Sequence, residues 1–361
     1  MKKALIGMSG GVDSSVAAYL TMEAGYQCIG ATMRLFSNDI LPEEQESTCC
    51  SLDDVEDARS VARRMGIPHY TFNLQEDFRR EVMEKFVRCY ESGQTPSPCI
   101  DCNRYLKFGT LLRRAQELGC THVVTGHYAR IRRDPDSGRY LLYRAADRQK
   151  DQSYFLYPLN QEMLSHALFP LGELTKPQVR EIAQNQGFIT ARKHDSQDIC
   201  FVPDGDYVAF MERFTGKHYP KGKYLDLQGN VLGQHQGAVC YTIGQRKGLG
   251  IALGAPAYVC GKDMVANTVT LGPNEALFAR GLLAGDWNWF PFPQLEQSIA
   301  VTAKIRNSQQ DFPATVYPEE NGQARVIFET PQRTITPGQA VVLYDGDMVV
   351  GGGTILQAIK D

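Results

Sequence analysis

Ser9-Gly10-Gly11-Val12-Asp13-Ser14-Ser15 lies between the apolar run Ala4-Leu5-Ile6 and an apolar segment from Val16 to Leu20. This order predicts a strand, a tight glycine turn and a helix. Two adjacent glycines allow the backbone to approach an anion closely, and the first amides of the following helix have no partner within the helix. The stretch is therefore a candidate phosphate-binding turn.

The spacing of this turn differs from two common nucleotide-binding loops. It has no lysine after its second glycine, and it lacks the third glycine of the dinucleotide-binding turn. Asp13 replaces the lysine, which suits a magnesium-bridged pyrophosphate better than a transferred γ-phosphate. A glycine turn before a helix can also be purely structural, so the spacing alone leaves both interpretations open.

Length and composition predict several domains in the cytosol. The chain has 361 residues, which is long for one compact domain, and 43% of them are hydrophobic. We find no run of about 18 apolar residues, and Lys2-Lys3 leads directly into the first expected strand, so we expect a soluble cytoplasmic protein with no membrane partner. In that compartment the 10 cysteines indicate catalysis, metal binding or burial.

Charge is segregated along the chain. The net charge of -3 gives no global attraction to nucleic acid. Residues 130–150 nevertheless contain seven basic and three acidic residues, and residues 43–57 contain seven acids and no base. The basic segment is our candidate for contacts with RNA phosphates, although either run can also be a solvated face.

The first part of the chain predicts an α/β fold with a doubly wound parallel sheet. The expected strands are Ala4–Gly7, Cys28–Met33, His69–Asn73 and His122–Thr125. The expected helices follow the phosphate turn, begin at Ser51, run from Phe78 to about Tyr90 and from Arg104 to Leu118, and run from Lys176 to Gln186. Ligands of such sheets bind beyond the carboxyl ends of the strands, where the phosphate turn, Met33 and Gly126-His127 lie.

Two further features concern the loops and the later domains. Between Thr95 and Asn103, two prolines predict an extended loop. From about residue 205, short β-type segments alternate with glycine turns, which indicates a small β-rich central domain and a C-terminal β-barrel. We expect domains at residues 1–203, 204–280 and 281–361.

Several motifs occur in one order at characteristic intervals: the SGGVDS turn, TPSPCIDCN (95–103), DQSYFL (151–156) and SQDICF (196–201). Together they resemble the tRNA-specific 2-thiouridylase family of the ATP pyrophosphatases, whose catalytic domain has the adenine nucleotide alpha hydrolase-like fold. The stretches YTIGQRKGLG (241–250) and TPGQAVVLYDGD (336–347) are also similar, so the resemblance covers essentially the whole chain.

The resemblance implies a sulfurtransferase. Such an enzyme uses ATP and Mg²⁺ to adenylate the 2-oxo group of uridine 34 in tRNAs for Lys, Glu and Gln. Sulfur from a cysteine persulfide then replaces the activated oxygen, giving 2-thiouridine, AMP and pyrophosphate. The sulfur would come from a donor such as a cysteine desulfurase or a sulfur-relay protein.

The resemblance also assigns residues to roles. The ATP-binding residues would be Gly7, Met8, Ser9, Gly10, Gly11, Val12, Asp13, Ser14, Met33 and Gly126, with Asp13 as a candidate for orienting Mg²⁺. Cys200 would carry the persulfide and Cys102 would act as nucleophile or resolving thiol, so that a Cys102–Cys200 disulfide ends the reaction and a reductant reopens it. Residues contacting tRNA would be Ser97, Pro98, Cys99, His127, Lys150, Asp151, Gln152, Arg306, Asn307 and Gln339.

This chain departs from the family pattern TPNPDxxCN at two positions. Ser97 replaces the asparagine, and Cys99 replaces an aspartate for which a thiol is a poor acid–base substitute. Cys99, Cys102 and Cys200 could alternatively hold a [4Fe-4S] cluster that delivers sulfide, while a fourth ligand at Cys49 or Cys50 would favour zinc or a closed cluster. Another RNA-modifying enzyme of the superfamily, and a non-catalytic RNA-binding or iron–sulfur protein, are the remaining alternatives.

Overall fold

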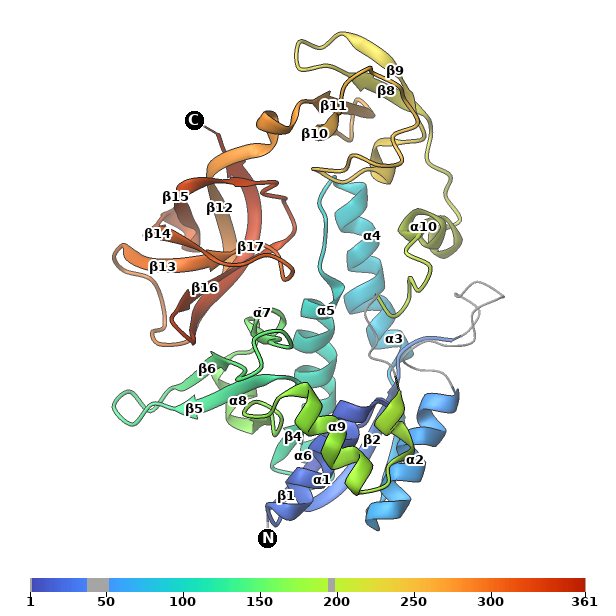
Figure 1. Cartoon of the computed structure of the whole chain (residues 1–361), viewed down its shortest axis with the longest axis vertical. Coiled ribbons are helices and arrows are strands. Elements are labelled where there is room, and N and C mark those ends of the chain that lie inside the picture. The colour runs from blue at the N-terminus through green and yellow to red at the C-terminus, as the bar shows by residue number, and fades with distance from the viewer. Residues whose placement is uncertain (1, 38–51, 194–198, 361) are drawn as a thin grey trace.

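The computed structural model describes residues 2–37, 52–193 and 199–360. Figure 1 shows the N-terminal sheet and its helices at one end of the molecule, a small sheet at the other end, and a barrel beside the helices that connect them. In the described ranges, no helix combines the length and the apolar character that a membrane crossing requires.

The N-terminal sheet is parallel and doubly wound. Its order is β3-β2-β1-β4-β7, with strands β1 (Lys3–Gly7), β2 (Gln27–Arg34), β3 (His69–Asn73), β4 (His122–Val124) and β7 (Ala167–Leu168). Ala4 and Ile6 pack on one face and Leu5 on the other, as alternation along a strand requires. The chain reverses its strand order beside β1, so the crevice between β1 and β4 is the expected ligand site. The predicted α/β class is confirmed.

Helices cover both faces of this sheet and extend toward the other domains (Figure 1). The α-helices are α1 (Val12–Glu23), α2 (Leu52–Met65), α3 (Gln75–Phe78), α4 (Glu84–Glu91), α5 (Pro98–Asp101), α6 (Leu111–Glu117), α7 (Ser153–Leu156), α8 (Gln161–His166), α9 (Lys176–Asn185) and α10 (Tyr207–Thr215). Two π-helical segments, η2 (Arg79–Met83) and η3 (Cys102–Thr110), lie within longer helical stretches. The 3₁₀ segments are η4 (Ile189–Arg192), η5 (Ala238–Cys240), η6 (Asn274–Leu277) and η7 (Glu320–Gly322).

The extended loop predicted through Asn103 is wrong in its second half. The helix begins at Pro98 and continues through α5, η3 and α6, rather than beginning at Arg104. Pro98 occupies the first helical position, where a missing N–H costs nothing, and Ser97 before it is extended (φ -116, ψ 90). Cys102 therefore lies on a helix and not on a loop.

The C-terminal region is a closed antiparallel barrel, as predicted. Its order is β12-β15-β14-β13-β16-β17 and β12 also pairs with β17. The strands are β12 (Phe278–Trp289), β13 (Ile299–Lys304), β14 (Phe312–Pro318), β15 (Ala324–Arg333), β16 (Ala340–Asp345) and β17 (Met348–Ile359). A hairpin of the N-terminal region, β5 (Ala129–Arg133) and β6 (Tyr140–Arg144), joins β17 through the pair Tyr143 and Met348. One hydrophobic core accordingly runs from the parallel sheet into the barrel.

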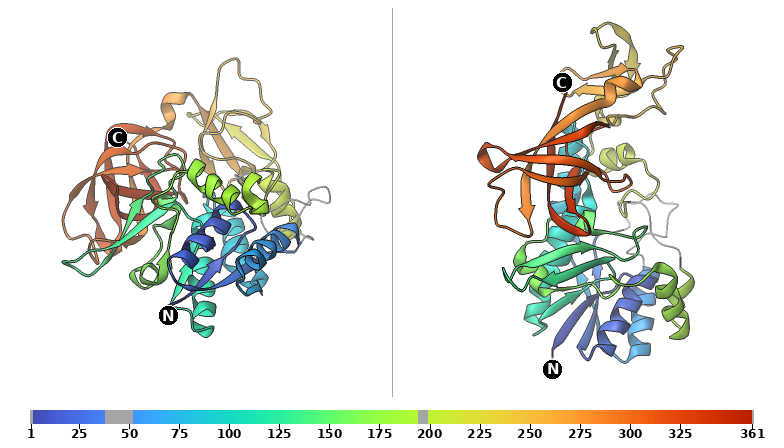
Figure 2. Two further views of the ribbon diagram at one scale, coloured as in Figure 1. Left: turned by 60° about the horizontal axis from the view of Figure 1, so that its bottom comes forward. Right: turned by 60° about the vertical axis from the view of Figure 1, so that its left-hand side comes forward.

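The central β-rich region forms a separate small sheet. Its strands β8 (Gly222–Leu225), β9 (Val231–His235), β10 (Tyr258–Asp263) and β11 (Thr268–Gly272) lie in the order β10-β11-β8-β9. Tyr224, Val259 and Val269 are fully buried in its core. Figure 2 shows this sheet beyond the end of the helical stretch that carries α4, away from the parallel sheet.

Candidate active site

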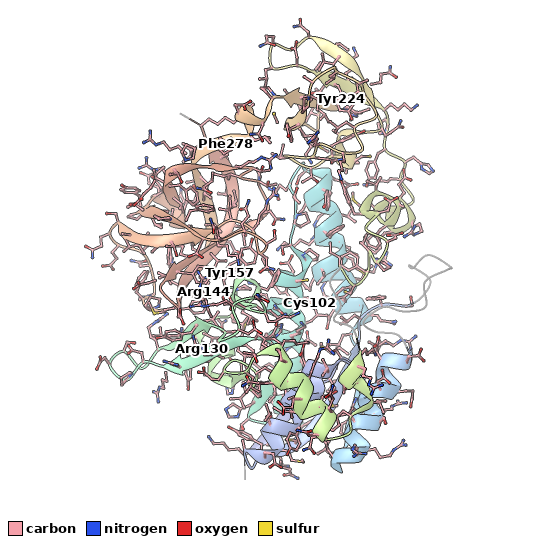
Figure 3. The ribbon with its side chains drawn as sticks, viewed as in Figure 1. Cys102, Arg130, Arg144, Tyr157, Tyr224 and Phe278 are labelled. Carbon is pink, nitrogen blue, oxygen red and sulfur yellow. The ribbon has the colours of Figure 1, made fainter. Side chains whose placement is uncertain are left out.

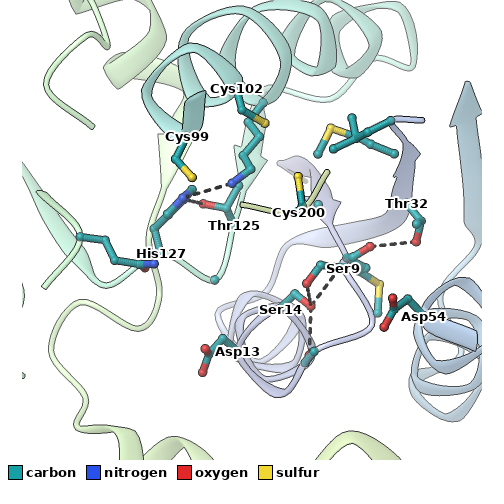
Figure 4. A pocket seen from close by; sticks show the side chains of 18 of the residues that line it. Ser9, Asp13, Ser14, Thr32, Asp54, Cys99, Cys102, Thr125, His127 and Cys200 are labelled. Carbon is teal, nitrogen blue, oxygen red and sulfur yellow. Dashed lines mark hydrogen bonds between the residues drawn. The ribbon is translucent and has the colours of Figure 1, made fainter. Parts of the chain in front are cut away.

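A cavity of about 450 Å³ opens at the carboxyl ends of β1, β2 and β4 (Figure 4). It lies at the predicted switch point of the sheet. Segments far apart in the chain line it. Its residues include Gly7, Met8, Ser9, Gly11, Val12, Asp13, Ser14, Met33, Pro98, Cys99, Cys102, Gly126, His127, Lys150, Gln152 and Cys200. Most of the residues assigned from sequence to nucleotide, sulfur and base thus share one cavity.

The phosphate turn forms one end of this cavity. Helix α1 begins immediately after Gly11, and because its N-cap is a glycine no side-chain cap occupies the first-turn amides. Ser14 Oγ accepts from the Ser9 backbone N–H at 3.1 Å and donates to the Gly11 carbonyl at 3.0 Å. These two bonds close the turn upon itself, which leaves a helix N-terminus directed at the cavity and suited to an anion.

Two glycines are required here by packing. Gly10 has φ +73, and a Cβ on it would lie 2.4 Å from the backbone oxygen of Asp54. A Cβ on Gly126 would lie 2.7 Å from the carbonyl carbon of Asp13 and 2.8 Å from the Ser14 nitrogen. Gly126 therefore allows the segment after β4 to approach the phosphate turn, a role that the sequence analysis did not identify.

Asp13 is held by two side chains. Lys176 Nζ, at the start of α9, contacts both carboxylate oxygens at 2.8 Å, and the Tyr128 hydroxyl donates to Oδ1 at 2.8 Å. Lys176 is buried. The carboxylate expected to orient Mg²⁺ is thus the partner of an internal ammonium group, and it does not fit a magnesium ligand in this arrangement. The sequence analysis missed Lys176, because nothing in the local pattern links α9 to the turn.

A second ammonium group closes the opposite wall of the phosphate end. Lys193 Nζ lies 2.6 Å from Asp54 Oδ1 and 2.6 Å from Asp57 Oδ2. Lys193 and Asp54 both line the cavity. Asp57 belongs to the acidic run noted in the sequence, so part of that run is an ion-paired helix face beside the site.

The other end of the cavity carries thiols. Figure 4 shows Cys99 and Cys102 on one helix, with Cys200 entering from a separate segment. Cys99 is exposed, whereas Cys102 and Cys200 are half-buried, and none of the three forms a disulfide with another described cysteine. Burial raises the pKa of the Cys102 thiol to about 11, while the charge of Lys107 acts to lower that pKa. Cys102 is therefore protonated at neutral pH in this state.

Next to the thiols lies a short chain of polar groups. Thr125 Oγ1 is 2.7 Å from His127 Nδ1, and Lys107 Nζ is 3.4 Å from His127 Nε2. An ammonium group only donates, so Nε2 accepts and Nδ1 carries the proton that is donated to Thr125. Burial, together with the charge of Lys107, lowers the pKa of His127 well below its usual value, so the ring is neutral. Neither Lys107 nor Thr125 was predicted from sequence as a site residue.

The residues assigned to tRNA lie in three places. Pro98, Cys99, His127, Lys150 and Gln152 line the cavity. Ser97 is the N-cap of α5, and Asp151 accepts hydrogen bonds from the backbone N–H groups of Ala145 and Ser153. Arg306, Asn307 and Gln339 belong to the barrel.

Two of these side chains already hold the fold together. Gln152 Oε1 accepts from the Tyr128 N–H at 3.0 Å. Gln339 Nε2 donates to the Thr95 carbonyl at 2.9 Å, which attaches the barrel to the segment that precedes the Cys102 helix. Both therefore have structural roles that the sequence analysis did not identify.

The basic segment 130–150 mainly joins the barrel to the N-terminal region. Arg130 pairs with Asp347 at 2.7 Å, and Arg144 pairs with Asp311 at 2.9 Å and lies 3.6 Å over the Tyr344 ring. Arg148 also pairs with Asp347. Figure 3 shows Arg144 at the junction of the hairpin and the barrel. Arg130, Arg144 and Arg148 are thus engaged by carboxylates of the barrel, and contact of this segment with RNA phosphates stays a prediction.

The described residues do not form an evident metal centre. Within residues 2–37, 52–193 and 199–360, no group of three or more His, Cys, Asp or Glu side chains converges to hold a metal ion. The three cysteines suggested as cluster ligands do not fit a [4Fe-4S] cluster as they stand. Cys49 and Cys50, the suggested fourth ligands, lie outside the described residues.

Comparison with known protein families divides the chain in three. Residues 2–204 match the tRNA methyl transferase HUP domain, residues 208–273 the tRNA methyl transferase PRC-barrel domain, and residues 279–355 the aminomethyltransferase beta-barrel domain. Among solved structures, a 4-thiouridine synthetase–RNA complex with bound ATP is 16% identical, covers 60% of this chain and 50% of its own, and has a TM-score of 0.35. That overlap is too low to support an argument.

Curated relatives match nearly the full length. The tRNA-specific 2-thiouridylase MnmA of Acetivibrio thermocellus is 50% identical and covers 98% of this chain and 99% of its own. The protein of that name from Heliobacterium modesticaldum is 51% identical over 98% of this chain and 92% of its own, and the one from Clostridioides difficile is 48% identical over 99% of both. With this identity over nearly all of its length, the chain belongs to the tRNA-specific 2-thiouridylase MnmA family.

Proposed function

We propose that this protein is a tRNA-uridine 2-sulfurtransferase. It adenylates the 2-oxo group of uridine 34 with ATP and replaces that oxygen with sulfur carried by Cys200, giving 2-thiouridine, AMP and pyrophosphate. The observation that carries this proposal is that the phosphate turn, Cys102 and Cys200 line the same cavity. A site with an activating nucleotide at one end and two thiols at the other suits exchange of oxygen for sulfur.

The nucleotide occupies the end of the cavity at the phosphate turn. The amides at the start of α1 bind the phosphates, and the half-buried side chain of Met33 packs at the adenine. Gly7 to Ser14 and Gly126 frame this end. Mg²⁺ bound with ATP would neutralise phosphate charge, and Asp13, which is engaged by Lys176, would not be its ligand in this arrangement.

Sulfur transfer proceeds at the thiol end by one of two balanced routes. In the first, the Cys102 thiolate attacks the inner sulfur of the Cys200 persulfide, forms a Cys102–Cys200 disulfide and releases hydrosulfide, which then attacks C2 of uridine and expels AMP. In the second, the terminal persulfide sulfur attacks C2 and expels AMP, and Cys102 then resolves the mixed disulfide. Each route needs a thiol reductant to reopen the disulfide.

The tRNA approaches from the side of the barrel. Ser97, Pro98 and Cys99 lie beside the target base, with His127, Lys150, Asp151, Gln152, Arg306, Asn307 and Gln339 as further contacts. A target base must leave its stack to enter such a cavity. Residues 1–203 form the catalytic domain in this scheme, and residues 204–280 and 281–361 support the tRNA. The substrates are tRNAs for Lys, Glu and Gln, and the reaction takes place in the cytoplasm.

The sulfur reaches Cys200 from a donor such as a cysteine desulfurase or a sulfur-relay protein. A [4Fe-4S] route through Cys99, Cys102 and Cys200 is the second candidate for sulfur delivery. The three thiols would have to converge further than they do here, which favours the persulfide.

The test is reconstitution. Purified protein, an unmodified tRNA for Lys, ATP, Mg²⁺, a thiol reductant and a cysteine desulfurase with cysteine should produce 2-thiouridine, detected by nucleoside mass spectrometry, with one AMP per product. Omission of ATP and the variant Cys200→Ser should each abolish the product. Cys89→Ser, which changes a half-buried thiol outside the cavity, is the matched control and should retain it.

Two results would redirect the proposal. Product formation by Cys200→Ser at the rate of the control would remove the persulfide role. Activity that follows iron and acid-labile sulfide in anaerobically purified protein, and that is lost from iron-free protein, would establish the cluster route instead.

A further inference from the structure

A lysine that sequence analysis did not single out lies at the thiol end of the cavity. Lys107 and Cys102 both belong to η3 and both line the cavity. They are five residues apart, and because η3 is π-helical this separation affects whether their side chains share a face.

The winding of η3 brings these two side chains to one face. A π-helix closes hydrogen bonds between residues i and i+5, so side chains five apart lie on roughly the same face, a little more than one turn apart. An α-helix has about 3.6 residues per turn, so the same two side chains would diverge around the axis. The π-helical stretch from Cys102 to Thr110 therefore turns Lys107 toward the cavity that Cys102 faces.

Lys107 is also fixed from the opposite wall. Its ammonium group lies 3.4 Å from Nε2 of His127, and Thr125 fixes that ring through Nδ1 at 2.7 Å. Because the ring is neutral and accepts from Lys107, this contact positions the ammonium group without neutralising its charge. A long, flexible side chain is thereby held at the thiol end.

Other titratable and charged groups also surround Cys102, on its own helix and on other elements. Asp101, the residue immediately before Cys102, pairs with Lys85 at 2.6 Å, and Cys99 is exposed. From other elements, His127, Lys150 and Cys200 line the cavity. Burial raises the pKa of Cys102, whereas Lys107 acts in the opposite direction.

We propose that Lys107 is the positioning residue that stabilises the thiolate of Cys102 for sulfur exchange, and that the π-helical winding of η3 exists to place it there. The proposal rests on the role of Cys102 given above. It applies to both routes of sulfur transfer, because in each the Cys102 thiolate attacks a sulfur atom. The proton leaves Cys102 to solvent, and Lys107 remains an ammonium group throughout.

The test measures Cys102 directly and needs neither tRNA nor ATP. Alkylation by iodoacetamide is followed at Cys102 by peptide mass spectrometry from pH 7 to 11 in the full chain. A neighbouring opposite charge commonly shifts a pKa by at least one unit, so Lys107→Met should slow alkylation at pH 8.5 about tenfold and move the profile to higher pH. Lys107→Arg should stay within about threefold of the parent rate because it keeps the charge.

Variants at two other lysines distinguish an effect of Lys107 from a general effect of removing a positive charge. Lys150→Met removes another ammonium group that lines the cavity and Lys223→Met removes an exposed one in the small sheet. Each should change the Cys102 rate less than twofold. An equal effect of Lys150→Met and Lys107→Met, or an unchanged rate in Lys107→Met with native circular dichroism, would overturn the inference.

Separate outcomes distinguish a folding defect of the variant, a failure of the proposed function and a failure of this inference. If Lys107→Met does not fold, Lys107→Gln takes its place, and a pH profile like that of the parent would again overturn the inference. If the parent protein does not thiolate tRNA, the proposed function is refuted, and the alkylation result for Cys102 still stands. Thiolation by the parent together with an unshifted Lys107→Met profile would refute the inference alone.

Discussion

At the phosphate end of the cavity, the turn and the helix start that would meet the phosphates come from one short stretch, Ser9 to Ser14, whereas at the thiol end Cys102 and Cys200 come from segments far apart in the chain. The phosphate end consists mainly of backbone amides, which a glycine turn and one helix start orient locally. The thiol end consists of side chains whose approach depends on the winding of η3 and on the segment from Ile199 to Phe201.

A site built from one continuous turn tolerates little change in its backbone, whereas a site built from distant segments depends on the contacts between them. Changes at the two ends should therefore separate activation of the uridine from sulfur transfer.

Removing a thiol should abolish sulfur transfer without affecting the activation of uridine by ATP. Cys102→Ser should lower 2-thiouridine formation roughly 1000-fold, because a hydroxyl cannot exchange with a persulfide. Pyrophosphate release with ATP and tRNA should stay within about threefold of the parent, because the phosphate turn is untouched. Both are measured in one reaction, by nucleoside mass spectrometry and a coupled pyrophosphate assay. Parallel loss of the two activities would contradict the separation.

Breaking the phosphate turn should eliminate both activities. In Gly10→Ala the new Cβ would meet the Asp54 backbone at 2.4 Å in a left-handed conformation, so the turn must shift. A displacement of this size should lower pyrophosphate release roughly 100-fold.

Gly25→Ala is the matched control for this change. Gly25 has a similar φ of +81, but a Cβ there meets nothing within 4 Å. The control should lose about 1 kcal/mol of stability from backbone strain and keep its activity. Pyrophosphate release by Gly10→Ala at the rate of Gly25→Ala would show that the close approach to α2 is dispensable.

The thiol end should respond to pH through a histidine. The unfolded chain protonates His127 near its usual pKa of about 6.5, whereas the folded chain keeps it neutral because burial and Lys107 lower its pKa. The unfolded state thus binds more protons below pH 6.5, so stability falls as the pH is lowered. Between pH 7.5 and 5.0, this group should contribute a loss of about 2 kcal/mol.

His127→Gln removes the titration while an amide still offers a donor and an acceptor. Urea denaturation at both pH values should show that the variant loses less stability than the parent between them. An equal loss in both proteins would mean that His127 is protonated in the folded state.

The smallest effect concerns the attachment of the barrel to the thiol end. Gln339→Ala removes hydrogen bonds to the carbonyl groups of Thr95 and Pro96 and should cost about 1 kcal/mol in urea denaturation. Asn307→Ala, at an exposed barrel position, should change stability by less than about 0.5 kcal/mol. Unchanged stability in Gln339→Ala would leave tRNA contact as the remaining role for this side chain.

Local patterns predicted most of the parallel sheet. The strands at Lys3–Gly7, Gln27–Arg34, His69–Asn73 and His122–Val124 lie where the apolar runs indicated. The two-residue strand β7 was missed because so short a strand has no periodicity to read. The π-helical segments were also missed, since propensity does not distinguish their winding from that of an α-helix.

The candidate site was predicted unevenly. The glycine turn and the two cysteines were identified from motifs, and the structure brings them into one cavity. Lys176 and Lys193 were missed, because their partners Asp13 and Asp54 lie far away in the sequence. The ion pairs of Arg130 and Arg144 with the barrel were not predicted, because charge in a sequence carries no information about its partners in the fold.

The phosphate turn, the strands that precede and follow it and the identity of the thiols could be predicted from sequence, because they depend on neighbouring residues and on side-chain chemistry. The ion pair of Asp13 with Lys176, the packing of Gly126 against the phosphate turn and the contact of Lys107 with His127 became apparent only in the folded chain. Each of these contacts joins elements that are far apart in the chain, so the packing of the sheet and helices sets it and no local pattern encodes it.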